Sequence, residues 1–275
     1  MLVYKISRSS FEQLHFDLPD FDSITMQLPS GLYTTFRTYA DRTKVIGLRA
    51  HLDRLYPPAK TLGMSAALNQ SQLREVLADL LKSLVPHEAR VRLILDTSKE
   101  LGDIYVLLQE LRALPPEVYQ EGVRVGISKA SRKKPLLKQT SFIAESSSER
   151  KRLSSERFEI LLTQNGRILE GMTSNFFYVR DGELHTAGRG VLSGVTRETV
   201  IAIARGAGIR VQYKALALRE IPEIDEAFIT SSSRGVVPVV KISDEVVGNA
   251  KVGKTTKQLM DLLEQKVSEI AESIF

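Results

Sequence analysis

The sequence predicts a fold of the α/β class, more closely α+β, with two domains in which mixed sheets carry flanking helices. Strand-like and helical segments follow one another without strict alternation, which favours sheets of mixed direction. The length of 275 residues is enough for two hydrophobic cores. A pair of prolines, Pro115 and Pro116, interrupts the pattern and predicts a linker. We therefore expect a small N-terminal domain over residues 1–112, a linker over 113–120 and a larger C-terminal domain over 121–275.

The N-terminal domain is expected to contain several strands, because short runs of β-branched and aromatic residues stand between turn signals. From residue 48 to 62 apolar residues recur at helical spacing, and residues 71–84 form a strongly amphipathic helical pattern. The expected strands of this domain cover residues 2–6, 24–28, 32–39, 89–95 and 104–108.

The C-terminal domain is expected to repeat this mixture of strands and helices. An Asn165-Gly166 pair between two apolar runs predicts a tight β-hairpin. A helical pattern over residues 197–205 is expected to stop at the glycines that follow it, and an amphipathic helix is expected from about Thr255. We also expect a polar helix over residues 143–154 and strands over residues 122–128, 158–162, 167–171 and 175–179, with three more before the last helix.

Composition excludes several kinds of site. Without cysteine, the chain has no disulfide, no zinc–thiolate site and no thiol nucleophile. Its four histidines form no H-E-x-x-H pattern, so no metal site is expected. The amino terminus lacks the apolar core of a signal peptide, and no run of about eighteen apolar residues occurs. We therefore expect a cytoplasmic protein that does not bind membranes.

The net charge of +5 predicts a modest preference for anionic small molecules. Basic residues gather at positions 132–134 and 150–152, but aromatic residues do not alternate with them, as a platform for single-stranded nucleic acid would require. Such short runs usually form solvated faces, so no nucleic-acid partner is expected. A non-enzymatic protein that binds anions or nucleic acid is the alternative with the least specific support.

One segment matches a nucleotide-binding pattern. Residues 248–255 read GNAKVGKT, which fits G-x-x-x-x-G-K-[ST] and precedes a predicted helix. In such a loop Lys254 would contact the terminal phosphate and Thr255 a magnesium ion. However, no strand follows Thr255 to supply the aspartate that holds the metal. A P-loop-like nucleotide-binding protein is therefore the alternative from a different functional class.

Three segments in the second half carry a more specific signal. They are PLLKQTSF around Lys138, RILEGMTSNFFYV around Glu170, and VLSGVTRETV, where Gly194, Val195 and Thr196 begin a helix. In this order and spacing they resemble the fold-type IV enzymes that depend on pyridoxal 5'-phosphate. Branched-chain aminotransferases, D-amino acid aminotransferases and aminodeoxychorismate lyases belong to that family. The resemblance covers nearly the whole chain and accounts for the GNAKVGKT segment as well.

The resemblance implies pyridoxal 5'-phosphate as the cofactor and assigns residues to it. Lys138 matches the catalytic lysine, whose amine forms a Schiff base with the cofactor and later moves a proton at the substrate Cα. Glu170 matches the carboxylate that keeps the pyridine nitrogen protonated. A helix N-terminus, hydroxyls and an arginine suit the phosphate. The other family positions at the cofactor correspond to Arg54, Ser174, Asn175, Val195, Thr196 and Ser232.

The resemblance also implies a set of residues that bind the substrate. These are Tyr33, Arg37, Arg90, Arg92 and Ser233. A pocket rich in arginine would suit a dicarboxylate acceptor such as 2-oxoglutarate.

Phe142 and Leu95 depart from the family pattern. Phe142 stands where many relatives carry a tyrosine close to the phenolic oxygen of the cofactor, so the partner of that oxygen is unassigned. Leu95 stands where D-amino acid aminotransferases carry an arginine that binds the substrate carboxylate. The second departure counts against a D-specific enzyme. On the same strand as Leu95, branched-chain enzymes carry a tyrosine and then an arginine; Arg90 and Arg92 keep the arginine here, but the tyrosine is absent.

Together these observations predict a two-domain fold-type IV aminotransferase with its cofactor between the domains. The expected reaction moves an amino group between an amino acid and a 2-oxo acid, with an L-amino acid and branched side chains favoured. The resemblance implies a homodimer. A D-amino acid aminotransferase or a lyase that releases pyruvate from 4-amino-4-deoxychorismate are the alternatives within the same fold.

Overall fold

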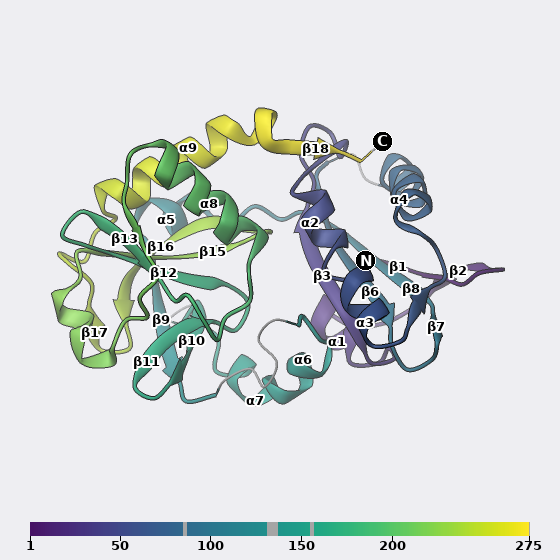
Figure 1. Ribbon diagram of the computed structural model, residues 1–275, viewed down its shortest axis with the longest axis horizontal. Coiled ribbons are helices and arrows are strands. Elements are labelled where there is room, and N and C mark those ends of the chain that lie inside the picture. The colour runs from purple at the N-terminus through teal and green to yellow at the C-terminus, as the bar shows by residue number, and fades with distance from the viewer. Residues whose placement is uncertain (85–86, 131–136, 155–156, 275) are drawn as a thin grey trace. The chain divides into compact units, whose positions relative to one another are not determined.

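The computed structural model describes residues 1–84, 87–130, 137–154 and 157–274, and the chain divides into two compact units (Figure 1). Unit 1 contains Met1–Arg112, Leu137–Glu145 and Val267–Phe275, and unit 2 contains Ala113–Leu136 and Ser146–Lys266. The units are thus not contiguous in sequence, since two later segments join unit 1. Leu137–Glu145 does so by pairing with a strand of that unit, where the Tyr33 amide donates to the Lys138 carbonyl at 2.8 Å. The basic run at 132–134 lies outside the described residues.

Unit 1 is built on an antiparallel sheet of five strands in the order β2-β1-β8-β6-β3. Residues 137–140 extend it beyond β3 through a bridge between Leu32 and Gln139. Two short strand pairs, β4 with β18 and β5 with β7, lie outside this sheet. The strands are β1 (Leu2–Ile6), β2 (Phe11–Leu14), β3 (Gly31–Arg37), β4 (Lys44–Ile46), β5 (Ser65–Ala66), β6 (Ala89–Asp96), β7 (Leu101–Gly102), β8 (Ile104–Glu110) and β18 (Ala271–Ser273).

The two faces of this sheet are buried by different helices. Leu32 and Phe36 face a core that includes residues of α2, α3 and α4, whereas Tyr33 and Ile94 face a core that includes residues of α1 and α6. This division follows from the two-residue period of a strand, which sends neighbouring side chains to opposite faces. The helices are α1 (Phe21–Thr25), α2 (Leu48–Leu52), α3 (Tyr56–Thr61), α4 (Gln70–Leu84) and α6 (Ser141–Glu145).

Three sequence-based expectations were wrong here. Residues 24–28 do not form a strand, because Asp20 accepts a hydrogen bond from the Ser23 amide at 2.8 Å and starts α1. The single helix expected over residues 48–62 is divided into α2 and α3, because two prolines stand at its middle and fit only the first turn of a new helix. The polar helix expected over residues 143–154 is two short helices, α6 and α7 (Ser147–Arg150).

Unit 2 is built on a nine-stranded sheet in the order β11-β10-β9-β16-β15-β12-β13-β14, with β17 paired to β16. The predicted mixed direction is confirmed, because β9 is parallel to both β10 and β16 while most other pairs are antiparallel. A further pairing of β11 with β12 closes six of the strands into a ring. The strands are β9 (Val123–Ser128), β10 (Glu159–Gln164), β11 (Arg167–Gly171), β12 (Asn175–Arg180), β13 (Glu183–Thr186), β14 (Val211–Gln212), β15 (Glu226–Ser231), β16 (Gly235–Ile242) and β17 (Glu245–Val246).

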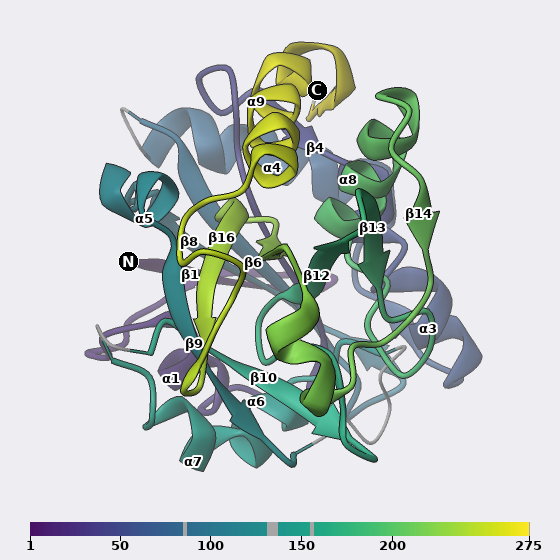
Figure 2. The same ribbon diagram turned by 90° about the vertical axis from the view of Figure 1, so that its left-hand side faces the viewer.

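The ring of strands surrounds an apolar core and is flanked by helices. Phe176, Tyr178 and Ile229 are among the buried residues of this core. Helix α8 lies beside β14 (Figure 2) and also contacts β15. The β10–β11 hairpin predicted from Asn165-Gly166 is confirmed, since both residues have the positive φ that its turn requires, 50° and 68°. The helices are α5 (Pro116–Gln120), α7, α8 (Val195–Gly206), the 3-10 helix η1 (Leu218–Glu223) and α9 (Lys254–Ile270), whose last residues belong to unit 1.

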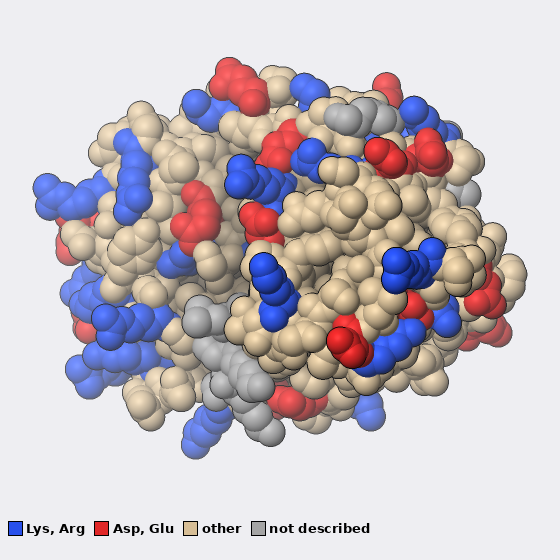
Figure 3. All heavy atoms as spheres, turned by 45° about the vertical axis from the view of Figure 1, so that its right-hand side comes forward, with Lys and Arg blue, Asp and Glu red and all other residues tan. Residues whose placement is uncertain are grey.

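Charged side chains of both signs are interspersed over much of the face drawn in Figure 3. Among the described residues, no helix combines the length and the apolar character needed to cross a bilayer.

Candidate active site

The segment that contains Lys138 is held at the edge of the unit 1 sheet by three hydrogen bonds. The Tyr33 amide donates to the Lys138 carbonyl at 2.8 Å, and the Thr140 amide donates to the Gly31 carbonyl at 2.9 Å. The Gly31 amide donates to Thr140 Oγ1 at 2.9 Å. Because Leu32 is bridged to Gln139, Lys138 lies opposite Tyr33, and its Nζ is 5.0 Å from the centroid of the Tyr33 ring. The strand pairing therefore aims the lysine amine along the face of the sheet that carries Tyr33.

Four substrate residues predicted from the sequence share that face. In the register of β3 and β6, Tyr33 is opposite Ile94, while Arg37 is opposite Arg90. Arg92 is on the same face, since it lies two residues from Arg90. The structure thus brings Tyr33 and three arginines together on the face along which Lys138 points.

The arginines on this face differ in how their charge is compensated. Arg92 is only 5% exposed and forms an ion pair with Asp22 at 2.8 Å. It also donates to Thr25 Oγ1 at 2.9 Å and to Thr35 Oγ1 at 3.0 Å, so its guanidinium is committed to the protein itself. The Arg37 guanidinium instead stacks on Tyr39, with its Cζ 4.7 Å from the centroid of the ring. Its buried Nε has no hydrogen-bond partner among the described residues. Arg37 is therefore better suited than Arg92 to bind an anion.

His51 is a buried residue to which the sequence assigned no role. It is 0% exposed, and its Nδ1 lies 2.6 Å from Thr34 Oγ1. Burial lowers the pKa of His51 well below its usual value, and the positive charges of Arg54 and Lys138 lower it further. The imidazole is therefore neutral near pH 7. Arg54 lies in the turn between α2 and α3, which is part of unit 1.

The two positions that depart from the family pattern are both in the interior. Leu95 is 1% exposed and packs in the core on the side of the sheet opposite to Tyr33. Phe142 is 7% exposed in α6.

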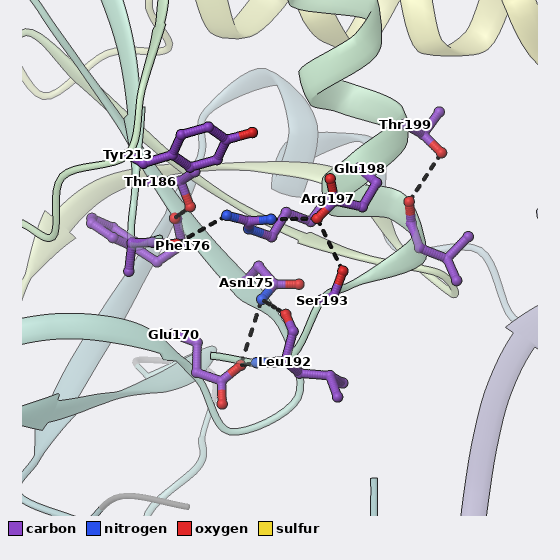
Figure 4. A network of polar contacts seen from close by, with 12 residues as sticks. Glu170, Asn175, Phe176, Thr186, Leu192, Ser193, Arg197, Glu198, Thr199 and Tyr213 are labelled. Atoms are coloured by element: carbon purple, nitrogen blue, oxygen red, sulfur yellow. Dashed lines mark hydrogen bonds and ion pairs between the residues drawn. The ribbon is translucent and has the colours of Figure 1, made fainter. Parts of the chain in front are cut away.

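In unit 2, Glu170 and Asn175 form a buried polar cluster where β11 meets β12. Figure 4 shows both side chains pointing toward the backbone of Leu192. Glu170 Oε2 accepts from the Leu192 amide at 3.0 Å and from Asn175 Nδ2 at 3.5 Å, and Asn175 Nδ2 also donates to the Leu192 carbonyl at 2.8 Å. Glu170 is 2% exposed and Asn175 is 5% exposed. A carboxylate fixed in this way is suited to bind and stabilise a cationic ring nitrogen.

The start of α8 has the features of an anion site. Gly194 is its N-cap and supplies no side chain to the first amides of the helix. Thr196 Oγ1 donates to Ser232 Oγ at 3.3 Å, which brings two hydroxyls together beside Val195. Free amides at a helix N-terminus attract phosphate, and hydroxyls add donors to it. The structure therefore brings together Val195, Thr196 and Ser232, three of the residues that the family resemblance assigned to the cofactor.

Glu159 and Arg234 are two charged residues of unit 2 that the sequence analysis missed. Ser174, a predicted cofactor residue, donates from its Oγ to Glu159 Oε2 at 3.1 Å, and Ser233 lies in the turn that contains Arg234. Glu159 is 1% exposed. The signal for it was a charged residue inside the apolar run FEILL, where an ionised side chain needs a partner.

The predicted site residues therefore fall into two groups. Unit 1 holds Tyr33, Arg37, Arg54, Arg90, Arg92 and Lys138. Unit 2 holds Glu170, Ser174, Asn175, Val195, Thr196, Ser232 and Ser233.

The nucleotide-binding pattern at residues 248–255 has a different explanation. The Glu226 carboxylate accepts from the Thr255 amide at 3.0 Å and from the Thr256 amide at 2.7 Å. These amides stand at the start of α9, where a bound phosphate would have to be. A carboxylate already occupies that position, so the structure argues against a P-loop.

Comparisons with known proteins bear on the family and the fold of the chain. The family model for "Amino-transferase class IV" matches residues 31–242. The chain is 30% identical over 264 residues to the "Probable branched-chain-amino-acid aminotransferase" of Thermotoga maritima, covering 92% of each chain. It is 22% identical over 283 residues to the D-alanine aminotransferase of Bacillus licheniformis, covering 93% of this chain and 94% of that one. The T.th. branched-chain amino acid aminotransferase, solved with pyridoxamine 5'-phosphate, has the same fold, with a TM-score of 0.82 at 20% identity, covering 100% of this chain and 98% of that one.

Proposed function

Because the chain belongs to the class IV aminotransferases, we propose that it moves an amino group between a branched-chain L-amino acid and a dicarboxylic 2-oxo acid. The observation that carries this proposal is the set of groups required by a pyridoxal 5'-phosphate enzyme. Unit 1 fixes a lysine at a sheet edge, and unit 2 fixes a buried carboxylate and a helix N-terminus with two hydroxyls.

The residues of unit 2 fit the chemistry of pyridoxal 5'-phosphate. Glu170 is buried and held by the Leu192 amide, so its charge is available in a fixed place for a protonated pyridine nitrogen. The amides of Val195 and Thr196, with the hydroxyls of Thr196 and Ser232, suit the phosphate. When bound, this cofactor supplies an electron sink that stabilises negative charge at the substrate Cα.

Each residue would then have a defined role. Lys138 would hold the cofactor through its Nζ and would serve as the base and acid that moves a proton at the substrate Cα. Glu170 keeps the pyridine nitrogen protonated. Arg54 is a cation suited to the phosphate, as the resemblance to the family implies.

Two features of unit 1 support the proposed substrates. Arg37 has a buried Nε without a hydrogen-bond partner among the described residues, which suits the carboxylate of an acidic 2-oxo acid. Leu95 is a core residue, so the position that binds the carboxylate in D-amino acid aminotransferases has no cation here. The name of the Thermotoga maritima relative supports a branched side chain. We further propose a homodimer, as expected for this family.

The test is the activity and absorption spectrum of Lys138→Ala. We expect transamination of leucine with 2-oxoglutarate to fall by about 1000-fold or more, because no other group would replace the lysine amine at Cα. The wild-type protein should show a visible absorption band that leucine shifts. Borohydride should abolish this band and leave the cofactor attached covalently to Lys138.

Lys254→Ala is the matched control, because it removes the lysine of the GNAKVGKT segment and should leave transamination unchanged. Full activity in Lys138→Ala would refute the proposal. Release of pyruvate from 4-amino-4-deoxychorismate without a 2-oxo acid would instead identify the lyase.

A further inference from the structure

Glu159 is a buried carboxylate with an unusually complete set of donors. It is the first residue of β10 and is 1% exposed. Its Oε2 accepts from Ser174 Oγ at 3.1 Å, from the Thr173 amide at 3.3 Å and from the Thr173 hydroxyl. A buried charge requires such donors together with a counterion. Glu159 therefore fixes the turn over residues 171–174 that leads from β11 into β12.

Arg234 supplies the counterion from a different turn. Its Nη2 lies 3.3 Å from Glu159 Oε2 and donates to Thr173 Oγ1 at 2.6 Å. Its Nε donates to Ser231 Oγ at 3.0 Å, and its carbonyl accepts from the Tyr119 hydroxyl at 3.0 Å. Arg234 is thus fixed at both its backbone and its side chain in the turn between β15 and β16.

Arg234 connects the two turns just beyond the last backbone pairing between β12 and β15. The ladder between β12 and β15 runs as far as Asn175, which is opposite Thr230. Beyond this pair the ladder between β12 and β15 does not continue, and side-chain contacts join the two turns. Among the described residues, the contacts of Arg234 with Glu159 and Thr173 join one turn to the other.

Each turn carries part of the proposed cofactor site. The first turn leads into Asn175, which binds Glu170. The second contains Ser232, which binds Thr196 at the start of α8. We propose that Glu159 and Arg234 are positioning residues that set the spacing between the groups for the pyridine nitrogen and those for the phosphate of pyridoxal 5'-phosphate. This inference rests on the proposed function and assigns it two residues that touch neither substrate nor cofactor.

The experiment measures the dissociation constant of pyridoxal 5'-phosphate for the apoprotein and the Tm of the apoprotein. Arg234→Met removes the counterion and both links, and Thr173→Val removes the hydroxyl link without changing any charge. We expect the dissociation constant to rise about tenfold in Arg234→Met and severalfold in Thr173→Val, because misplaced groups bind less tightly. The Tm of apo Thr173→Val should stay close to that of the wild type. Arg234→Lys should recover part of the affinity.

Arg180→Met is the matched control, since Arg180 forms an ion pair with Glu223 at 2.7 Å elsewhere in unit 2. It should leave the dissociation constant unchanged. The inference is overturned if Thr173→Val and Arg234→Met bind the cofactor as tightly as the wild type. It is also overturned if Arg180→Met weakens binding as much as Arg234→Met at an equal loss of Tm. If the wild-type apoprotein itself takes up no pyridoxal 5'-phosphate, the proposed function fails as well.

Discussion

The two units hold their proposed functional residues in different ways. In unit 1, Lys138 and the arginines take their places from strand register, through regular backbone pairing. In unit 2, the side chains of Glu170 and Thr196 are in addition held by side-chain hydrogen bonds, to the Leu192 amide and to the Ser232 hydroxyl. The first arrangement keeps each side chain nearly independent of the others, whereas the second makes the side chains depend on one another.

This difference predicts how far the effect of a mutation extends to neighbouring residues. Removing a side chain from the face of β3 and β6 leaves the backbone ladder in place, so the loss stays local. Removing a member of the cluster around Glu170 leaves a buried donor without its acceptor, which disturbs the neighbours too.

Within unit 2, the largest expected effect comes from variants that distinguish the two roles of Glu170. Glu170→Gln keeps an oxygen for the Leu192 amide but cannot hold a protonated pyridine nitrogen. We expect transamination to fall by about 100-fold or more with a small change in Tm. Glu170→Ala should lower both, because the Leu192 amide also loses its acceptor. Steady-state kinetics and thermal melts of the two variants measure the transamination rate and the Tm.

Glu183→Gln is the control for this pair, since Glu183 forms its ion pair with Arg210, which is 75% exposed, and should change neither quantity. If Glu170→Gln lost as much Tm as Glu170→Ala, the carboxylate would be a structural group only.

A smaller effect is expected within unit 1, where Arg92 and Arg37 should respond in opposite ways. Arg92→Met removes the ion pair with Asp22 and should reduce the free energy of unfolding by about 2 kcal/mol, less than for a fully buried pair because Asp22 is partly exposed. Arg37→Met should change stability by less than about 1 kcal/mol and raise KM for 2-oxoglutarate about tenfold. Urea unfolding and initial rates test the pair. An unchanged KM in Arg37→Met would remove this residue from the proposed substrate site.

The smallest expected effect is on the stability of the protein in acid. It is tested by comparing His51 in unit 1 with His185 in unit 2. Burial lowers the pKa of both histidines in the folded protein, and that of His51 is lowered well below 6.5. Below pH 6.5 the unfolded chain therefore takes up a proton that the folded chain excludes, and stability falls as pH falls. The slope for His51 approaches at most about 1.4 kcal/mol per pH unit.

We expect His51→Asn to flatten the dependence of the free energy of unfolding on pH between about 6.5 and 5 more than His185→Asn does. Urea titrations at several pH values measure both slopes. Equal slopes in the wild type and His51→Asn would mean that His51 is accessible to protons in the folded protein.

Local sequence patterns predicted regular elements well. The amphipathic pattern at residues 71–84 became α4, and Asn165-Gly166 formed the hairpin turn that its positive φ angles allow. The strand predicted over residues 24–28 was wrong because a strand-like composition does not reveal an N-cap four residues upstream. The two helices at residues 48–61 show the same limit, since spacing alone gave too little weight to paired prolines.

By itself, the sequence determined the mixed fold, its main strands and helices, and a list of residues matched to a family. Only the tertiary structure decided which of those residues have their charge compensated by other groups of the protein. Arg92 and Arg37 look alike in sequence, yet Asp22 neutralises one of them. Glu159 and Arg234 are 75 residues apart, and no local pattern links them. Periodicity reports the short-range geometry of the backbone, whereas ion pairs and hydrogen bonds between distant segments exist only after the chain has folded.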